Sequence, residues 1–533
     1  MAQPTTGIGV LQNRIREELP SVIHESLPAI APLFEKIKSS SISVQRDTGI
    51  GRGWKVMHTY ETGVAGLIET ADPLGPTMAT MIPTASHAQA HMLELGSTQG
   101  GSTSGYLDIF PEAREAPHCG DILRELTLHK SVGNFSMPVQ WMQADALSAT
   151  QLKKVARDIQ AVGKNKAVIE ASSFFSHSVT NASGYENQVL GRISSIDTTP
   201  SGFTDYIEIT IDEEYGRICN FRQGMSIDVV NDTAGVLEDG VAVDGSDVAN
   251  YDASTNYVRL IIIDVDFLAK TVLLRPIDVS DGTTPAVADG WVGATTFVGA
   301  ADDWLTLAHT TKYTGGSRPQ FSWGLNDMIK SSGKIMGGAT AAGALDLTYY
   351  KQFKSSVVAV NSPLTDDVLN RYIAGYLDAY PGMTIDTIIT TQGVNQQWLQ
   401  QPQLGAGRFM YDRTGKSLKM KGGWSEVTYE WGGRVFQYIV SPMCLNKTLY
   451  AVKFGEGNFT RYVPPTVGGS SSQVGGVEFL APLGGHSGIF KIAHSSGGRS
   501  QDLVEAPFWQ YGLVAPLDPK GIKLTGLTEA TMV

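Results

Sequence analysis

The chain is poor in cysteine, with only three among its 533 residues. Cys119, Cys219 and Cys444 lie far apart and are odd in number. A disulfide framework or a zinc cluster would instead show paired or closely spaced cysteines. We therefore predict neither, and this usage fits a reducing compartment such as cytoplasm.

Charge is also scarce, because charged residues make up 18% of the chain against roughly 25% in ordinary globular proteins. The 41 basic and 53 acidic residues give a net charge of −12. This balance argues against a dedicated nucleic-acid-binding protein, for which a basic stripe is expected. The low charge content indicates surfaces that contact a partner. Glycine, at 58 residues, exceeds its usual share of about 7% and predicts long loops and arms.

The sequence lacks any apolar run of the roughly 18 residues that a membrane helix requires, and its start lacks the basic-then-apolar pattern of a signal peptide. It also contains no G-x-x-x-x-G-K-[ST] loop, no H-E-x-x-H pair and no G-x-S-x-G elbow. We therefore predict no membrane partner, no catalysed reaction, no catalytic residues, no cofactor and no metal.

Four weak site patterns remain. His87 and His91 are four residues apart, as a metal-binding pair on a helix would be, but we interpret them as polar loop residues. Asp264 and Asp266 alternate on an expected strand, and a solvated strand face explains them better than a calcium site. Ser331 to Lys334 fits S-x-x-K, which is too short a pattern to indicate chemistry. One basic cluster lacks the interleaved aromatic residues that stack on bases, so we interpret it as a solvated or inter-subunit loop: Arg408, Arg413, Lys416, Lys419 and Lys421.

A long amphipathic helix is predicted between residues 147 and 175. Ser148 and Gln151 form a capping box, in which each side chain satisfies a backbone N–H at the helix start. Such a helix would span on the order of 35–40 Å, and Gly163 allows a bend. Residues at three- and four-residue spacing form its apolar face: Leu152, Val155, Ala156, Ile159, Val162 and Lys166.

The segments before this helix have three different patterns. In residues 1–57, Pro20, Pro28 and Pro32 predict several short helices, whose apolar face fits packing on its own domain or on a neighbour. Residues 58–118 hold a long unpatterned stretch that would be anomalous inside a compact domain. Residues 119–145 alternate apolar and polar side chains, so we predict strands that lead into the helix.

After the helix, the pattern changes twice. Residues 184–320 are short strand-like runs separated by turn clusters, which predicts a small inserted barrel or sandwich. Residues 362–445 indicate an α/β unit. There, Thr365 or Ser362 caps a helix, a second helix starts at Asn395, and residues 432–433 turn a hairpin. The first helix has a buried stripe at three- and four-residue spacing: Val368, Leu369, Tyr372, Ile373 and Tyr376.

In this order, the segments resemble the major capsid proteins of tailed double-stranded DNA phages, which have the Hong Kong 97 (HK97) fold. Residues 381–399, PGMTIDTIITTQGVNQQWL, are similar to the axial-domain pattern of that family. The resemblance implies an α+β fold whose segments follow one another along the chain. These are an N-terminal arm (1–57), an extended loop (58–118), a peripheral domain with a spine helix (119–183), an inserted β domain (184–320), a return to the peripheral domain (321–361), an axial domain (362–445) and C-terminal peripheral strands (446–533).

The resemblance also implies a function. The chain would self-assemble into hexamers and pentamers of an icosahedral virion head, made in the host cytoplasm. Its partners would be copies of itself, a portal protein and, in some phages, scaffolding and decoration proteins. Packaged DNA would lie near it without specific binding. The first 57 residues look like an arm, so we expect a separate scaffolding protein or none. The alternative is a modular β-rich tail or adhesin component, or a multi-domain enzyme.

Some relatives lock their shells with a covalent bond from an extended-loop lysine to a neighbour's asparagine. No lysine occurs from Val56 through His129, and Lys55 and Lys130 only flank this segment. We therefore predict that boiled, reduced particles run as a single band near 57.3 kDa on a denaturing gel. A ladder of heavier bands would show that another lysine, such as Lys416 or Lys419, forms the bond.

Overall fold

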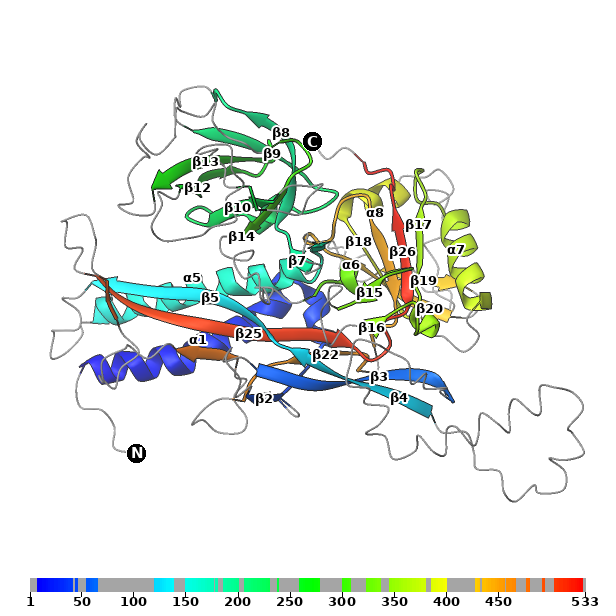
Figure 1. Ribbon diagram of the computed structural model, residues 1–533, viewed down its shortest axis with the longest axis horizontal. Coiled ribbons are helices and arrows are strands. Elements are labelled where there is room, and N and C mark those ends of the chain that lie inside the picture. Colours follow the sequence, from blue (N-terminus) through cyan, green and yellow to red (C-terminus); the bar gives the residue numbers. More distant parts are fainter. Residues whose placement is uncertain are drawn as a thin grey trace, which may run out of the picture.

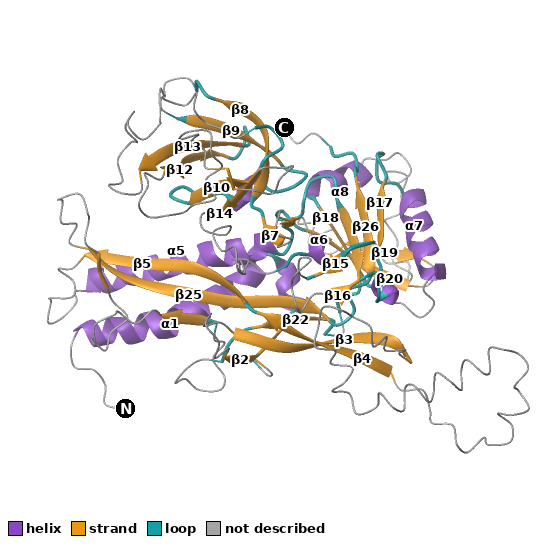
Figure 2. Ribbon diagram, viewed as in Figure 1, coloured by secondary structure: helices purple, strands orange, loops and turns teal. Residues whose placement is uncertain are grey.

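The structure is a computed structural model that combines few helices with several sheets (Figure 2). It describes residues 7–41, 44–46, 54–65, 119–138, 149–176, 178–180, 186–200, 206–230, 237–238, 258–278, 300–307, 323–336, 345–379, 385–399, 427–431, 434–455, 457–465, 476–479, 491–493 and 503–530. The chain is therefore of the α+β class.

The predicted long helix is present as α5, Ala149–Ser173. Its expected capping residue, Ser148, lies outside the described residues. Val155 and Ile159 of the predicted apolar face are fully buried, and Lys166 on the same face is only 9% exposed. The three- and four-residue spacing thus located the buried face correctly, including its one charged member.

The N-terminal segment differs from the prediction, because residues 7–30 form one helix, α1 (Gly7–Ile30), with Pro20 and Pro28 inside it. Two prolines cost a helix roughly 3 kcal/mol each. The helix buries an apolar stripe at four-residue spacing, and each such side chain contributes about 1.5–3 kcal/mol. The free energy gained by this burial outweighs the cost of the two prolines. The buried residues of the stripe are Leu11, Ile15, Leu19, Ile23 and Leu27.

Helix α1 packs along α5 within the same chain (Figure 1). The two helices approach closely at Gly163, where an added Cβ would lie 2.6 Å from Cγ1 of Val22. A glycine at this position therefore serves helix–helix contact. The apolar face of the arm is buried on its own domain, which was one of the two alternatives that the sequence left open.

A long antiparallel strand pair covers these helices. β5 (His129–Pro138) pairs with β25 (Leu503–Pro516) along its whole length, and Figure 1 shows the pair running beside α5. Phe135 and Phe508 from these strands join Val155 and Ile159 of α5 in one buried cluster. The other strands on this sheet are β1 (Lys38–Ser40), β22 (Phe459–Tyr462), β23 (Val477–Phe479) and β24 (Lys491–Ala493).

A long hairpin precedes β5. β3 (Trp54–Ala65) pairs with β4 (Cys119–Thr127) from Lys55–Thr127 out to Ala65–Cys119. β2 (Val44–Arg46) adds to β3 only at residues 54–56. β3 crosses the predicted start of the extended loop at residue 58, and β4 begins directly after its predicted end at residue 118. Residues 66–118 lie outside the described residues.

The segment predicted as an inserted domain forms a seven-stranded sheet with its own buried cluster. Its hydrogen-bonded order runs β11-β10-β12-β13-β9-β8-β14. Because β14 also pairs with β10, the path from β10 to β14 closes on itself, and β11 adds to β10 outside it. The strands are β8 (Gly191–Asp197), β9 (Ile207–Asp212), β10 (Ser226–Val230), β11 (Leu237–Glu238), β12 (Val258–Asp266), β13 (Thr271–Asp278) and β14 (Trp304–Leu307).

The α/β unit forms around a six-stranded sheet in the order β17-β26-β21-β18-β20-β19. Thr365 caps α7, because its Oγ1 accepts the backbone N–H of Val368 at 3.1 Å. The second helix, α8, starts at Gln392, three residues before the predicted start. The elements are β17 (Ser356–Ala359), α7 (Asp366–Ala379), β18 (Thr387–Thr390), α8 (Gln392–Leu399), β19 (Val427–Trp431), β20 (Arg434–Val440), β21 (Leu449–Val452) and β26 (Gly521–Thr525).

Three of these strands lie in a different sheet from the one predicted. β17 was expected in the peripheral domain, and β21 and β26 were expected among its C-terminal strands. β26 pairs with both β17 and β21, and β21 pairs with β18. β26 can join this sheet because the chain returns to the unit after β25. The remaining described elements are η1 (Pro32–Lys36), β6 (Ser178–Thr180), β7 (Glu186–Gln188), η4 (Ile218–Asn220), α6 (Leu325–Met328), β15 (Lys334–Ile335), β16 (Leu345–Asp346) and η7 (Lys351–Phe353).

The close helix contact predicts opposite effects for two glycine substitutions. Gly163→Ala should lower the free energy of unfolding by about 1–3 kcal/mol through overpacking against Val22. Gly375→Ala, in α7 with open space around it, should raise it by about 0.5–1 kcal/mol through helix propensity. Urea unfolding measures both, and Val22→Ala should rescue Gly163→Ala. Equal stabilisation by both alanines would contradict the contact.

Candidate functional site

The described residues hold no group of three or more His, Cys, Asp or Glu side chains that could bind a metal ion. Among the same residues, no helix is long and apolar enough to cross a membrane. His87, His91 and the basic cluster at 408–421 lie outside the described residues. Ser331 is exposed at a turn, and Lys334 begins β15.

Asp264 and Asp266 both lie on the exposed end of β12. Oδ1 of Asp266 accepts the backbone N–H groups of Leu268 and Ala269 at 2.8 and 2.9 Å. These two bonds hold the pKa of Asp266 below its usual range. The carboxylate therefore fixes the turn that follows the strand.

Cys219 and Cys444 are free thiols. Sγ of Cys219 lies 3.3 Å from Sδ of Met443, and burial raises the pKa of both thiols. A raised pKa leaves little thiolate, which is the reactive form. The two cysteines are thus packing residues at the contact between η4 and the β20–β21 loop.

The structure brings polar and charged side chains together in three clusters, and each cluster lies where units of the fold meet. The first is the hairpin root, where β3 passes over the end of β25, and it consists of His58, Tyr60, Arg124, Tyr462 and Pro516. The second is the spine cluster on α5, which consists of Lys166, Glu170, Arg461 and Gln510. The third is the junction between the seven-stranded sheet and the α/β unit, which consists of Glu213, Glu214, Arg217, Lys270, Asn446, Lys447 and Glu529.

At the hairpin root, His58 is fully buried and both of its ring nitrogens are engaged. Nε2 lies 2.8 Å from the carbonyl oxygen of Pro516, and Nδ1 lies 3.0 Å from the hydroxyl of Tyr462. Because a carbonyl can only accept, Nε2 carries the hydrogen and Nδ1 accepts from the tyrosine. Burial lowers the pKa of His58 to about 4, so the ring is neutral near pH 7.

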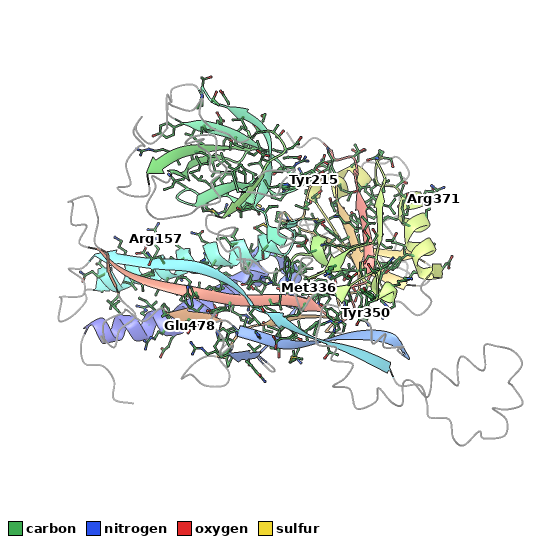
Figure 3. The ribbon with its side chains drawn as sticks, in the orientation of Figure 1. Arg157, Tyr215, Met336, Tyr350, Arg371 and Glu478 are labelled. Carbon is green, nitrogen blue, oxygen red and sulfur yellow. The ribbon has the colours of Figure 1, made fainter. Side chains whose placement is uncertain are left out.

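The hairpin is also held from its other side. The hydroxyl of Tyr60 donates to Sδ of Met336 at 3.1 Å, and Nη2 of Arg124 donates to the hydroxyl of Tyr350 at 2.9 Å. Met336 and Tyr350 (Figure 3) lie in the part of the chain between β14 of the seven-stranded sheet and β17 of the six-stranded sheet. Burial raises the pKa of the Tyr60 hydroxyl. Both hairpin strands are therefore clamped to the body at their inner ends.

In the spine cluster, Glu170 of α5 forms a bidentate ion pair with Arg461 of β22. The Arg461 side chain is only 4% exposed. Nη2 of Arg461 lies 2.9 Å from Oε2 of Glu170, and Nε pairs with the other oxygen. Nε2 of Gln510, from β25, donates to the same Oε2 at 2.7 Å. One carboxylate thus ties the long helix to two strands of the covering sheet.

Lys166 lies one turn before Glu170 and is also largely buried, at 9% exposure. Its Nζ donates to Oγ of Ser131 on β5 at 3.2 Å and lies 5.9 Å from the ring centroid of Phe508. Burial lowers the pKa of Lys166 to about 8. Its long aliphatic stem explains why it occupies a position on the apolar face.

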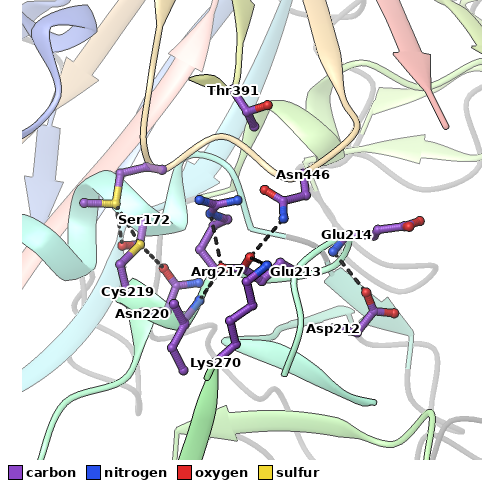
Figure 4. Close-up of polar contacts among 12 residues, drawn as sticks. Ser172, Asp212, Glu213, Glu214, Arg217, Cys219, Asn220, Lys270, Thr391 and Asn446 are labelled. Carbon is purple, nitrogen blue, oxygen red and sulfur yellow. Dashed lines mark hydrogen bonds and ion pairs between the residues drawn. The ribbon is translucent and has the colours of Figure 1, made fainter. Parts of the chain in front are cut away.

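At the junction, Glu213 follows β9 and is only 6% exposed. Nζ of Lys270 lies 2.7 Å from its Oε2, and Nδ2 of Asn446 donates to the same oxygen at 2.9 Å. The backbone N–H of Asn446 also donates to the Glu213 carbonyl at 3.0 Å. Figure 4 shows these groups converging from the seven-stranded sheet and the β20–β21 loop. Burial opposes ionisation of Glu213, but Arg217 and Lys270 outweigh it and lower its pKa.

A second bridge crosses the same junction. Nζ of Lys447 pairs with Glu214, and the backbone N–H of Lys447 donates to Oε1 of Glu529 at 2.8 Å. Oγ1 of Thr391 donates to that oxygen as well, just before the start of α8. A carboxylate at a helix N-terminus is favourable. The last described residues of the chain therefore join α8 to the junction.

None of these charged residues was singled out from the sequence, except Lys166 through its place on the helix face. Apart from Arg217, which lies four residues from Glu213, their partners are tens to hundreds of positions away, so no local motif marks them. Each buried charge that we describe has a structural partner, and none of the three clusters pairs a nucleophile with a base. What this arrangement can do is hold a hairpin, a helix and two sheets in fixed relation.

Comparison with known proteins gave no match to a protein-family model and no match to a curated protein. Among solved structures, the chain is similar to the cyanophage A-1(L) capsid asymmetric unit, with 9% identity over 94% of this chain and 93% of the other and a TM-score of 0.34. It also matches the holo-SrpI encapsulin complex of Synechococcus elongatus PCC 7942 at 12% identity and a TM-score of 0.20. That second match spans 33% of this chain and 55% of the encapsulin chain.

The neutral His58 predicts a pH effect on stability. Its pKa is about 4 in the fold and about 6.5 when unfolded, so protons bind the unfolded chain more tightly. Stability is lost as pH falls from about 6.5 towards 4, by about 3 kcal/mol in total. Urea unfolding across this range measures the loss.

The matched variant is His58→Gln, which can still donate to Pro516 but does not titrate. It should be less stable than the wild type at pH 7, and the difference should shrink steadily as pH falls to 4. A difference that stays constant with pH would show that His58 is not held neutral.

Proposed function

We propose that this chain is the major capsid protein of a tailed double-stranded DNA bacteriophage. It would assemble into hexamers and pentamers of an icosahedral shell around the genome. The observation that carries the proposal is the β3–β4 hairpin, which is clamped to the body at one end and extends beyond the sheet that supports it.

The hairpin needs a partner along its edges. β2 pairs with β3 only as far as Val56, and no described strand pairs with the outer edge of β4. From residue 57 outward, the hairpin therefore has no strand partner at either edge in the described part of the chain. Its support from the body comes from one face, where His58 and Tyr60 are buried. Isolated two-stranded ribbons are marginally stable in water, and open edges favour pairing with another chain. A neighbouring copy supplies that support in a shell.

The body of the subunit suits the same role. α5 and α1 form a long stiff layer under the β5–β25 pair (Figure 1), and the α/β unit adjoins one end of it. The polar clusters join these units to each other and do not line a reactive centre. A subunit that transmits contacts between neighbours requires this rigidity, and we propose that it catalyses no reaction.

The proposed partners follow from the proposed role. They are other copies of the chain, a portal protein, and scaffolding and decoration proteins where a phage uses them. The acidic net charge of −12 favours a shell that does not adhere to packed DNA. The subunit would be made in the host cytoplasm and would end in the virion.

The test uses the hairpin register. Ala65 pairs with Cys119, so residues 66–118 can be replaced by Asn-Gly, a two-residue turn that closes such a pair. This variant should fold with the circular dichroism and urea midpoint of the wild type but form no closed particles in size exclusion and light scattering.

A matched control shortens a different loop by joining Glu238 of β11 to Val258 of β12 through a Gly-Ser linker, and it should still give particles. Normal particles from the hairpin variant would contradict the proposal. Loss of folding in the hairpin variant would contradict the view that the contacts of His58, Tyr60 and Arg124 are enough to hold the shortened hairpin on the body of a single subunit.

A further inference from the structure

The turn between β12 and β13 presents two large apolar side chains to solvent. Leu268 is 95% exposed and Phe267 is 54% exposed. Within the described part of the chain, Val357 is the only other exposed large hydrophobic residue. Single exposed apolar residues are ordinary, but here two adjacent ones stand at the end of a hairpin. We call Phe267 and Leu268, with the turn that carries them, the apolar tip.

The apolar tip is held in one conformation. Asp266 Oδ1 accepts the N–H groups of Leu268 and Ala269, and Lys270 closes the turn with a φ of 60°. The Lys270 carbonyl accepts the N–H of Ile211 at 3.0 Å. The Arg222 guanidinium lies 5.9 Å from the Phe267 ring centroid. A preorganised anchor loses little entropy on binding, so the exposed pair is suited to recognition.

The tip is also fixed relative to the rest of the subunit. Lys270, which ends the turn, pairs with Glu213, and Glu213 accepts two hydrogen bonds from Asn446 of the α/β unit (Figure 4). The position of the tip is thus set by the junction. A surface held in this way can meet the same neighbour at every equivalent place in a symmetric assembly.

The area of the tip decides what kind of partner it fits. Covering both side chains would bury on the order of 250 Å², about a third of the roughly 800 Å² per partner in a stable protein–protein interface. The tip alone cannot hold a separate protein. It can add to contacts that already hold two copies together, because the second contact is then effectively intramolecular. The rim of the tip carries charges of both signs, from Asp264, Asp266, Arg222 and Lys270. A surface with both signs can complement a copy of itself, which suits contact between identical chains.

We propose that the apolar tip is a contact between copies of this chain, in which Phe267 and Leu268 insert against the surface of a neighbouring subunit. This inference rests on the proposed shell function and adds a second inter-subunit contact, separate from the β3–β4 hairpin. Other contacts bring the two copies together, and the tip then stabilises the assembled particle.

The test places a photo-crosslinking amino acid, p-benzoylphenylalanine, at position 268 of the full chain. After irradiation of purified particles, a denaturing gel should show a band at twice the 57.3 kDa subunit mass, and mass spectrometry should find the adduct on another copy. The control carries the same amino acid at Ser331, an exposed turn residue of another unit, and should give at least fivefold less adduct.

A second variant, Phe267→Ser with Leu268→Glu, should leave the urea midpoint of the subunit unchanged and lower the urea concentration at which particles dissociate. Particles that give no adduct at position 268, or an adduct with a different protein, would overturn the tip contact and leave the shell function standing. A wild-type chain that forms no particles would overturn both.

Discussion

The buried ion pair between Glu170 and Arg461 is the interaction on which the arrangement of the subunit most depends. It joins α5 to β22, and Gln510 on β25 completes the coordination of the carboxylate. Removing one partner of a buried pair typically costs about 3–5 kcal/mol, since it leaves an uncompensated charge. The pair therefore sets where the long helix lies along the sheet, and α1, the hairpin root and the junction all depend on that placement.

Three largely buried polar side chains lie where units of the described chain meet. They are His58 at the hairpin root, Glu170 under the sheet, and Glu213 between the seven-stranded sheet and the α/β unit. In an enzyme, such groups would converge on a cleft with shifted pKa values suited to proton transfer. Here the bonds that we describe go to structural partners in the same chain, as the proposed shell role would require. This pattern, with the unpaired edges of the described β3–β4 hairpin, supports the proposed shell role.

Much of the local structure could be predicted from the sequence, and the failures have physical causes. The spacing of Val155, Ile159 and Lys166 located the buried face of α5. Of the two capping residues predicted for α7, Thr365 and Ser362, the cap is Thr365. These signals could be read because they act within a few residues. Helix α1 was missed because tertiary burial of its stripe overrides the cost of Pro20. The sheet that holds β21 and β26 was missed because strand pairing between residues 69 to 75 positions apart leaves no local pattern. The buried charges were missed for the same reason, and no cue in the sequence points to Phe267 and Leu268 as exposed.

The central claim is that the chain forms a closed shell in which each hairpin rests on a neighbour. Electron cryomicroscopy of the purified full-length protein tests it most directly. The account predicts icosahedral particles in which β3 and β4 lie against the next subunit and residues 57–65 pair with or pack on it. A monomer or a small defined oligomer, with both hairpin edges in solvent, would contradict it.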